Sequence, residues 1–187
     1  MIAGNGQVTT DSAMPHVVFL RAVNVGGHQK FQPSVLAREL ADFDVISVGA
    51  AGTFVVRAKV AEAALRKEIL KRLTFEPEMM ICPAREILEL AREKGFGKEQ
   101  LEKDVQRFVS VMAKAPRLLP RLPISQPGGD QWEVKIVAVR GRCAQTLRRP
   151  RGKRGVYPNE IVEKTFGVPA TTRNWTTIAK ICDILSE

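Results

Sequence analysis

Polar residues that could bind an anion gather at two corners of the sequence, far apart along the chain. The first is NVGGHQK (24–30), where Gly26 and Gly27 permit close backbone approach and consecutive N–H groups beside Lys30 could form an anion nest. The second is TTRNW (171–175), which we expect to be a turn that opens an amphipathic helix, whose positive end could hold an anion. Neither has the spacing of a Walker loop or a dinucleotide fingerprint. Their chemistry is anion binding, and no catalytic set is recognisable.

Each corner also has a purely structural interpretation. Paired glycines mark turns between a strand and a helix, and Thr172 or Asn174 could cap the helix that follows TTRNW. Trp175 would then belong to the core. Arg21, which interrupts an apolar run, is either a solvated strand end or part of a polar site, because a buried arginine needs a partner.

A stretch of seven basic residues without an acid lies between positions 140 and 154. Its members are Arg140, Arg142, Arg148, Arg149, Arg151, Lys153 and Arg154. Without these seven charges the net charge of the chain would fall from +9 to +2, so the basicity is local. Such a stretch indicates a polyanionic partner or an anionic ligand, and solubility is the competing explanation.

The chain has few histidines and cysteines that could form a catalytic site or a metal site. His16 and His28 are the only histidines, which argues against a zinc centre or a Ser-His-Asp arrangement. The three cysteines, 82, 143 and 182, are odd in number and far apart, which predicts reduced, mostly buried thiols in a cytoplasmic protein. We therefore expect no metal and no cofactor.

Length and composition predict a folded protein of one domain or of two halves that share a core. The chain has 187 residues, of which 44% are apolar and 26% charged. No apolar run is long enough to cross a membrane, so we expect no membrane partner. We expect residues 1–13 to be a flexible tail, 14–94 and 105–187 to be the halves, and 95–104 to connect them.

Hydrophobic periodicity predicts an α+β fold made of two ferredoxin-like halves with antiparallel sheets packed by helices. The first half reads as strand, helix, hairpin, helix and strand, at 16–23, 33–40, 44–58, 61–73 and 79–82, with a further helix from residue 83. The second reads as strand, short helix, hairpin and helix, at 107–113, 115–123, 132–149 and 159–166. A last helix carries an apolar stripe at Ile178, Ile181, Cys182 and Leu185.

Three segments together resemble a family of uncharacterised bacterial proteins, the domain of unknown function 1697 (DUF1697). They are LRAVNVGGHQK (20–30), VGAAGTFVV (48–56) and EKTFGVPATTRNWTTIAKI (163–181). The resemblance implies the same two ferredoxin-like halves and no established activity. The hairpin departs from the family pattern, with AAGT (50–53) where Ser-Gly-Asn is typical. The resemblance implies a polar surface made of Arg21, Asn24, Gly26, Gly27, Thr171, Thr172, Arg173, Asn174 and Trp175.

These observations support three hypotheses about function. The first is a non-enzymatic cytoplasmic module that binds nucleic acid or another phosphorylated ligand through the basic stretch, with Arg21, Lys30 and Arg173. The second is a small enzyme or metabolite-binding protein with a pocket between NVGG and TTRNW. In the third, these motifs are structural, and Arg173 and Asn174 brace one half against the other.

Overall fold

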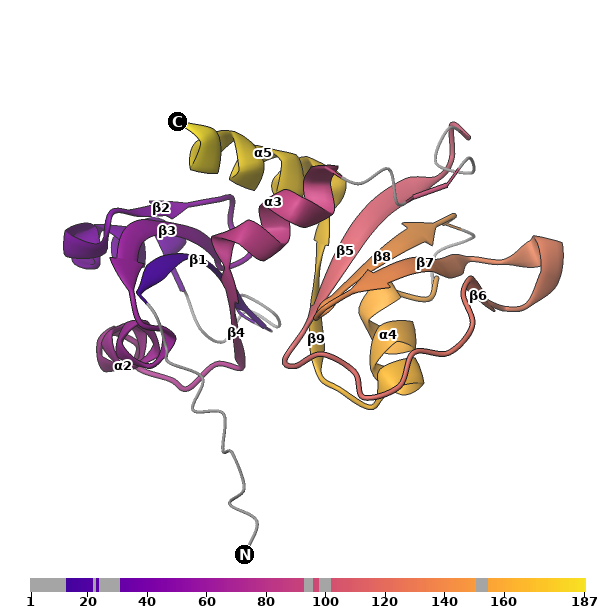
Figure 1. The fold of residues 1–187 in the computed structure, drawn as a ribbon, viewed down its shortest axis with the longest axis horizontal. Helices are drawn as coiled ribbons and strands as arrows, with labels where there is room; N and C mark the ends of the chain where they lie inside the picture. Colours follow the sequence, from indigo (N-terminus) through magenta and orange to yellow (C-terminus); the bar gives the residue numbers. More distant parts are fainter. Residues whose placement is uncertain (1–12, 22, 24–30, 93–95, 98–101, 151–154) are drawn as a thin grey trace, which may run out of the picture.

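A computed structural model of the chain describes residues 13–21, 23, 31–92, 96–97, 102–150 and 155–187. In these residues the fold is mixed α+β, with two antiparallel sheets and five α-helices (Figure 1). Several residues of the predicted sites lie outside the described residues, so the roles assigned to them remain predictions. They are Asn24, Gly26, Gly27, Lys30, Arg151, Lys153 and Arg154.

The first sheet is built from residues 14–83 and has the strand order β2-β3-β1-β4. Its elements are β1 (Met14–Leu20), α1 (Pro33–Glu39), η1 (Ala41–Phe43), β2 (Val45–Ser47), β3 (Thr53–Val60), α2 (Glu62–Arg72) and β4 (Met79–Pro83), followed by α3 (Ala84–Arg92). Gly49 and Gly52 have positive φ values of 70° and 66° in the hairpin between β2 and β3. The two glycines bend the chain there, as the sequence predicts.

The second sheet has the strand order β6-β7-β8-β5-β9. Its elements are β5 (Gln106–Met112), β6 (Ile124–Gln126), η3 (Gly129–Gln131), β7 (Val134–Arg140), β8 (Cys143–Arg148), α4 (Pro158–Phe166) and β9 (Ala170–Asn174), followed by α5 (Trp175–Ser186). In both sheets the strand that comes first in sequence lies between one strand of a hairpin and the last strand, as β1 lies between β3 and β4 and β5 between β8 and β9. β6 is an additional edge strand of the second sheet.

Two sequence predictions about the second half are wrong. The short helix expected at 115–123 is absent, and this segment is irregular between β5 and β6. Three prolines in nine residues explain this, because proline lacks the N–H that a helix interior needs. TTRNW is not a turn: its first four residues belong to β9, which pairs with β5. Consecutive β-branched threonines suit a strand, and the helix begins only at Trp175.

Each strand of the first sheet sends alternate side chains to two different cores. On one face, Val18 and Leu20 pack with α1 and α2, and Figure 1 shows α2 below the sheet. On the other face, Val17 and Phe19 share a core with α3, α5 and residues of the second sheet. A third core lies between the second sheet and α4. The two sheets are therefore joined through one continuous apolar core.

α5 closes this shared core. Ile178 and Ile181 are fully buried, and Cys182 and Leu185 are partly buried against the same cluster, so the predicted stripe faces inward. Ile184 extends the stripe. Figure 1 shows α5 and α3 side by side across the top of both sheets. The C-terminal helix thus fixes the position of one sheet relative to the other.

Candidate functional site

Arg173 brings the end of β1, the β2–β3 hairpin and β9 together. The side chain leaves β9 and is buried, with 8% of the residue exposed. All five of its N–H groups have oxygen acceptors inside the protein. The acceptors are Thr53 Oγ1 at 2.6 Å, Ala51 O at 2.7 Å, Thr171 Oγ1 at 2.8 Å, and Leu20 O and Thr172 O at 2.9 Å.

Arg173 remains charged at pH 7, and its N–H groups are all hydrogen-bonded within the protein. Its acceptors are carbonyl and hydroxyl oxygens rather than carboxylates, and its guanidinium lies 5.7 Å from the centre of the Phe19 ring. Burial lowers the pKa of the guanidinium to about 10, which still leaves it a cation at pH 7. In this arrangement no N–H of Arg173 is left for a ligand. The geometry is that of a brace between the halves.

Asn174 and Trp175 form the start of α5. Asn174 Oδ1 accepts a hydrogen bond from the Thr177 N–H at 2.9 Å, and two neighbouring threonine hydroxyls donate to the same atom. The capping role that the sequence offered to Thr172 or Asn174 therefore belongs to Asn174. Trp175 is half-buried and packs edge-to-face on Phe96, with ring centres 5.0 Å apart. Both residues have structural roles that would exist without a ligand.

Arg21 spans the same seam from its solvent side. Its guanidinium forms ion pairs with Glu78, which precedes β4, and with Glu163 of α4, the latter at 2.9 Å. Glu163 also accepts a hydrogen bond from the Ala170 N–H at 2.8 Å, so one carboxylate ties α4, β9 and Arg21 together. The Arg21 side chain remains 29% exposed. Of the two predicted arginines, this one is open to a small molecule.

A pocket of about 460 Å³ opens beside Arg21 at this seam. We call it the seam pocket; it is lined by Arg21, Phe108, Tyr157, Pro158, Asn159, Ala170, Thr171 and Thr172. Arg21, Thr171 and Thr172 are residues that the sequence analysis proposed. Sequence reasoning missed Phe108, Tyr157 and Asn159, although a tyrosine and an asparagine flanking the proline that starts α4 are a usable signal.

Some polar groups of the seam pocket already have hydrogen-bond partners in the protein, and others can bind a ligand. Thr172 Oγ1 lies 2.7 Å from Ser110 Oγ, and Thr171 Oγ1 accepts from Arg173, which leaves the Thr171 hydroxyl proton for another acceptor. The Tyr157 ring is 56% exposed, and the Arg148 guanidinium lies 4.6 Å from its centre. The pocket therefore combines aromatic surface with hydroxyl groups.

The basic stretch does not form one patch in the described residues. Arg140 and Arg142 lie at the β7–β8 turn, whereas Arg148 and Arg149 lie at the far end of β8. Six residue steps along a strand separate these ends by about 20 Å, which exceeds the roughly 8 Å over which charges act in physiological salt. Charges that are neighbours in sequence are thus distributed over two sites.

Two of these arginines are also paired with acids from elsewhere in the chain. Arg142 donates to the Ile81 carbonyl at 2.8 Å and lies 3.5 Å from the Glu86 carboxylate, which adds another link between the halves. Arg149 pairs with Glu102 and, at 3.5 Å, with Asp104, while its guanidinium lies 4.3 Å from the centre of the Trp132 ring. Their positive charge is therefore largely compensated.

The buried cysteines Cys82 and Cys143 are unsuited to thiol chemistry. Burial raises the pKa of the Cys82 thiol well above its usual value and that of Cys143 to about 12, so neither is a reactive thiolate at pH 7. Within the described ranges, no group of three or more His, Cys, Asp or Glu residues could hold a metal ion. None of the helices there has the length and hydropathy needed to cross a membrane.

Comparison with known proteins gives a family but no activity. No curated protein and no solved structure matches the chain. One family model does match, over residues 14–139, which is more than half of the chain and includes the whole first sheet, α3, β5, β6 and all but the last residue of β7. The chain therefore belongs to the family described as proteins of unknown function, DUF1697.

Proposed function

We propose that this chain is a cytoplasmic small-molecule-binding protein built from two ferredoxin-like halves, with its site in the seam pocket. The strand order shared by the two sheets supports the description of the halves. The observation that carries the site is the convergence of Arg21, Thr171 and Thr172 on one pocket between the halves. Pockets for small molecules commonly occur at such junctions and have volumes of about 300–1,000 Å³, a range that includes this one.

Charge decides which class of molecule fits the seam pocket. The one positive charge of Arg21 is opposed by two carboxylates, those of Glu78 and Glu163. The Arg148 guanidinium beside Tyr157 adds a second positive charge, and the Glu133 carboxylate lies near that guanidinium. A phosphate would have to compete with both carboxylates for Arg21. We therefore infer a planar, polar and uncharged ligand, such as a nucleobase or nucleoside, that stacks on an aromatic ring.

Tyr157 and Asn159 give this ligand its contacts. Tyr157, of which 56% is exposed, offers an aromatic surface for stacking. The Asn159 side-chain amide, half-buried at the pocket wall, offers both a donor and an acceptor to a base edge. Arg173 does not touch the ligand in this proposal. It holds β1, the hairpin and β9 in the positions that shape the pocket.

The test is a titration with adenosine and uridine, with their monophosphates for comparison, followed by NMR. Tyr157→Ala should weaken nucleoside binding roughly 5- to 150-fold, the value of one base stacked on an aromatic side chain. Tyr157→Phe should retain most of it, and Arg57→Ala, a surface change on β3, should have no effect. Failure of every nucleoside to bind, or equal binding by Tyr157→Ala, would overturn the proposal.

Polyanion binding through the basic stretch is the second candidate, supported by the seven basic residues without an acid. Arg142 and Arg149 are poor test positions because they hold the fold together. The better test replaces Arg151, Lys153 and Arg154 together by alanine and measures binding of fluorescent RNA and DNA over a range of salt. The logarithm of affinity should fall steeply with the logarithm of salt, and the variant should lose up to about three units of that slope.

A further inference from the structure

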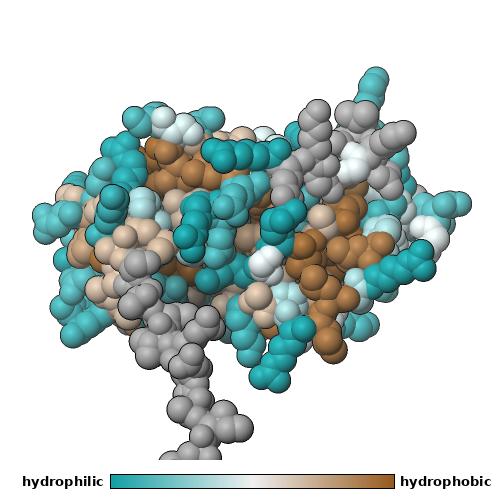
Figure 2. All heavy atoms as spheres, in the orientation of Figure 1, coloured by the Kyte–Doolittle hydropathy of each residue, from teal (hydrophilic) through white to brown (hydrophobic). Residues whose placement is uncertain are grey.

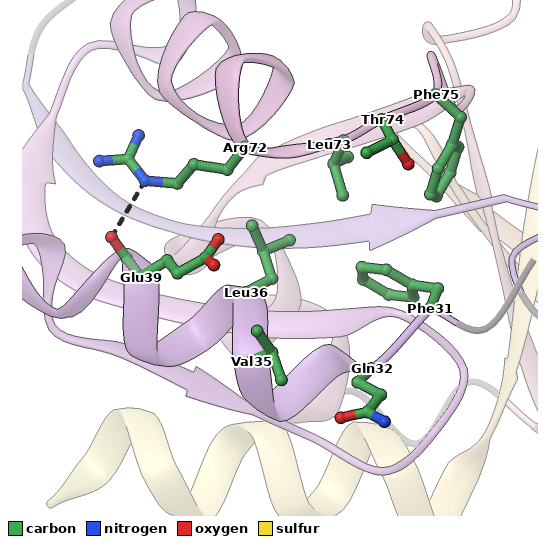
Figure 3. A pocket seen from close by; sticks show the side chains of 9 residues that line it. All are labelled: Phe31, Gln32, Val35, Leu36, Glu39, Arg72, Leu73, Thr74 and Phe75. Atoms are coloured by element: carbon green, nitrogen blue, oxygen red, sulfur yellow. Dashed lines mark hydrogen bonds between the residues drawn. The ribbon is translucent and has the colours of Figure 1, made fainter.

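A second pocket lies on the first half, away from the seam, between α1 and the end of α2 (Figure 3). It has a volume of about 340 Å³ and an apolar floor, formed by Leu36, which is 3% exposed and belongs to the core under the sheet. Val35 and Leu73 extend this apolar surface. We call it the α1–α2 pocket. This volume lies near the lower end of the range of about 300–1,000 Å³ that is usual for small-molecule sites.

Two phenyl rings close one end of the α1–α2 pocket. Phe31 and Phe75 lie edge to face, with ring centres 5.9 Å apart and planes at 86°. Phe31 also contacts Phe54 of the core, at 6.3 Å, so the aromatic wall is anchored to the sheet. An aromatic face attracts a cation, and such an interaction strengthens as water is excluded. This end therefore accepts an apolar body that carries a positive charge.

A carboxylate faces the same pocket from α1. Figure 3 shows the Glu39 carboxylate extended toward Leu36, away from the tip of the Arg72 guanidinium. Arg72 Nε donates at 3.0 Å to the main-chain carbonyl of Glu39 instead. Its Nη1 donates to the Glu68 carbonyl and carboxylate, both at 2.8 Å. Within the described part of the chain, the Glu39 carboxylate thus has no ion-pair partner, although an arginine lies beside it.

We propose that the α1–α2 pocket binds an organic ammonium ion with an apolar or aromatic body. The Glu39 carboxylate supplies the negative charge, the phenyl wall supplies cation–π attraction and shape, and the Leu36 floor buries the apolar part. The Arg72 guanidinium points away from the Glu39 carboxylate and pairs with Glu68, which also pairs with Lys71. This site is independent of the seam pocket and differs in its preference, because it selects a cation rather than an uncharged ligand.

The experiment compares three small probes of one shape: phenethylamine, which is cationic, 2-phenylethanol, which is neutral, and 3-phenylpropionate, which is anionic. Binding is followed by methyl NMR of Leu36 and Leu73 in the full chain. We expect the amine to bind more tightly than the alcohol by roughly two- to fivefold, the value of one exposed ion pair. The carboxylate should bind most weakly.

Glu39→Gln tests the charge without changing the shape of the pocket. The variant should bind the amine about as weakly as the alcohol and should leave alcohol binding unchanged, and its matched control, Glu76→Gln, should behave as the unmodified protein. The proposal is overturned if the three probes bind equally, if Glu39→Gln retains the preference, or if no probe shifts the two leucines at about 10 mM. None of these outcomes bears on nucleoside binding in the seam pocket.

Discussion

Replacing Arg173 by alanine should destabilise the protein far more than replacing a surface arginine. The change removes five internal hydrogen bonds at once, three of them between fully buried groups. Hydrogen bonds to a charged group are worth about 1.5–3 kcal/mol each, so the three buried ones at the lower value give about 4.5 kcal/mol. Water can satisfy some freed acceptors, and loss of a desolvated charge offsets part of the cost. We therefore expect a loss of about 3–5 kcal/mol.

Thermal unfolding followed by circular dichroism measures this loss. For a chain of this length, about 3–5 kcal/mol corresponds to a fall in Tm of roughly 6–20 °C. Arg173→Lys should be intermediate, because an ammonium keeps the charge but offers three donors in place of five. Arg57→Ala is the control: Arg57 pairs with Asp44 at 2.8 Å on the surface, where solvent screens the pair and its contribution to stability is small.

Equal Tm values for Arg173→Ala and Arg57→Ala would contradict the stabilising role of Arg173. That result would mean that water replaces the internal bonds of Arg173 without loss. The Arg173 pKa of about 10 leads to a second expected result, which concerns pH. Since Arg173 is charged at both pH 6 and pH 8, the effect of its replacement should be the same at the two values.

Three further predictions concern other parts of the fold. Gly52→Ala should cost about 1–3 kcal/mol more than Gly49→Ala in denaturant unfolding, because both have positive φ but only at Gly52 would a new Cβ lie 2.7 Å from a valine side chain. Trp132→Ala should cost about 3–5 kcal/mol and Trp175→Ala about half of that, since Trp132 is 4% exposed and Trp175 is half-buried; equal losses would contradict the assigned burial. Hydrogen bonds from the arginine and then the lysine in the last turn of α2 lower the Glu68 pKa from 4.5 to about 2. Its stabilisation is therefore complete above about pH 4.5 and is lost as the pH falls toward 2, so Glu68→Gln should lower Tm at pH 7 and leave it unchanged near pH 2.

Local pattern was enough to predict most of the elements. The alternation of apolar residues placed the strands of the first sheet, and the spacing of Ile178 and Ile181 identified the buried face of α5. Gly49 and Gly52 marked the hairpin because only their own backbone conformation is involved. Where the pattern was ambiguous it failed: TTRNW contains capping residues and β-branched residues together, and pairing with β5 decided in favour of a strand.

Residue types alone identified the unusual positions, whereas the contacts of those residues depend on how distant segments of the chain pack together. Arg173 drew attention as a polar residue near a helix start, but its acceptors lie up to 153 residues away, at Leu20. Likewise the basic stretch is one cluster in sequence, whereas the extended backbone of β8 separates its two ends and acids from other segments pair with Arg142 and Arg149. Periodicity records only neighbours within a few residues, so the partner of a buried charge is decided by chain packing alone.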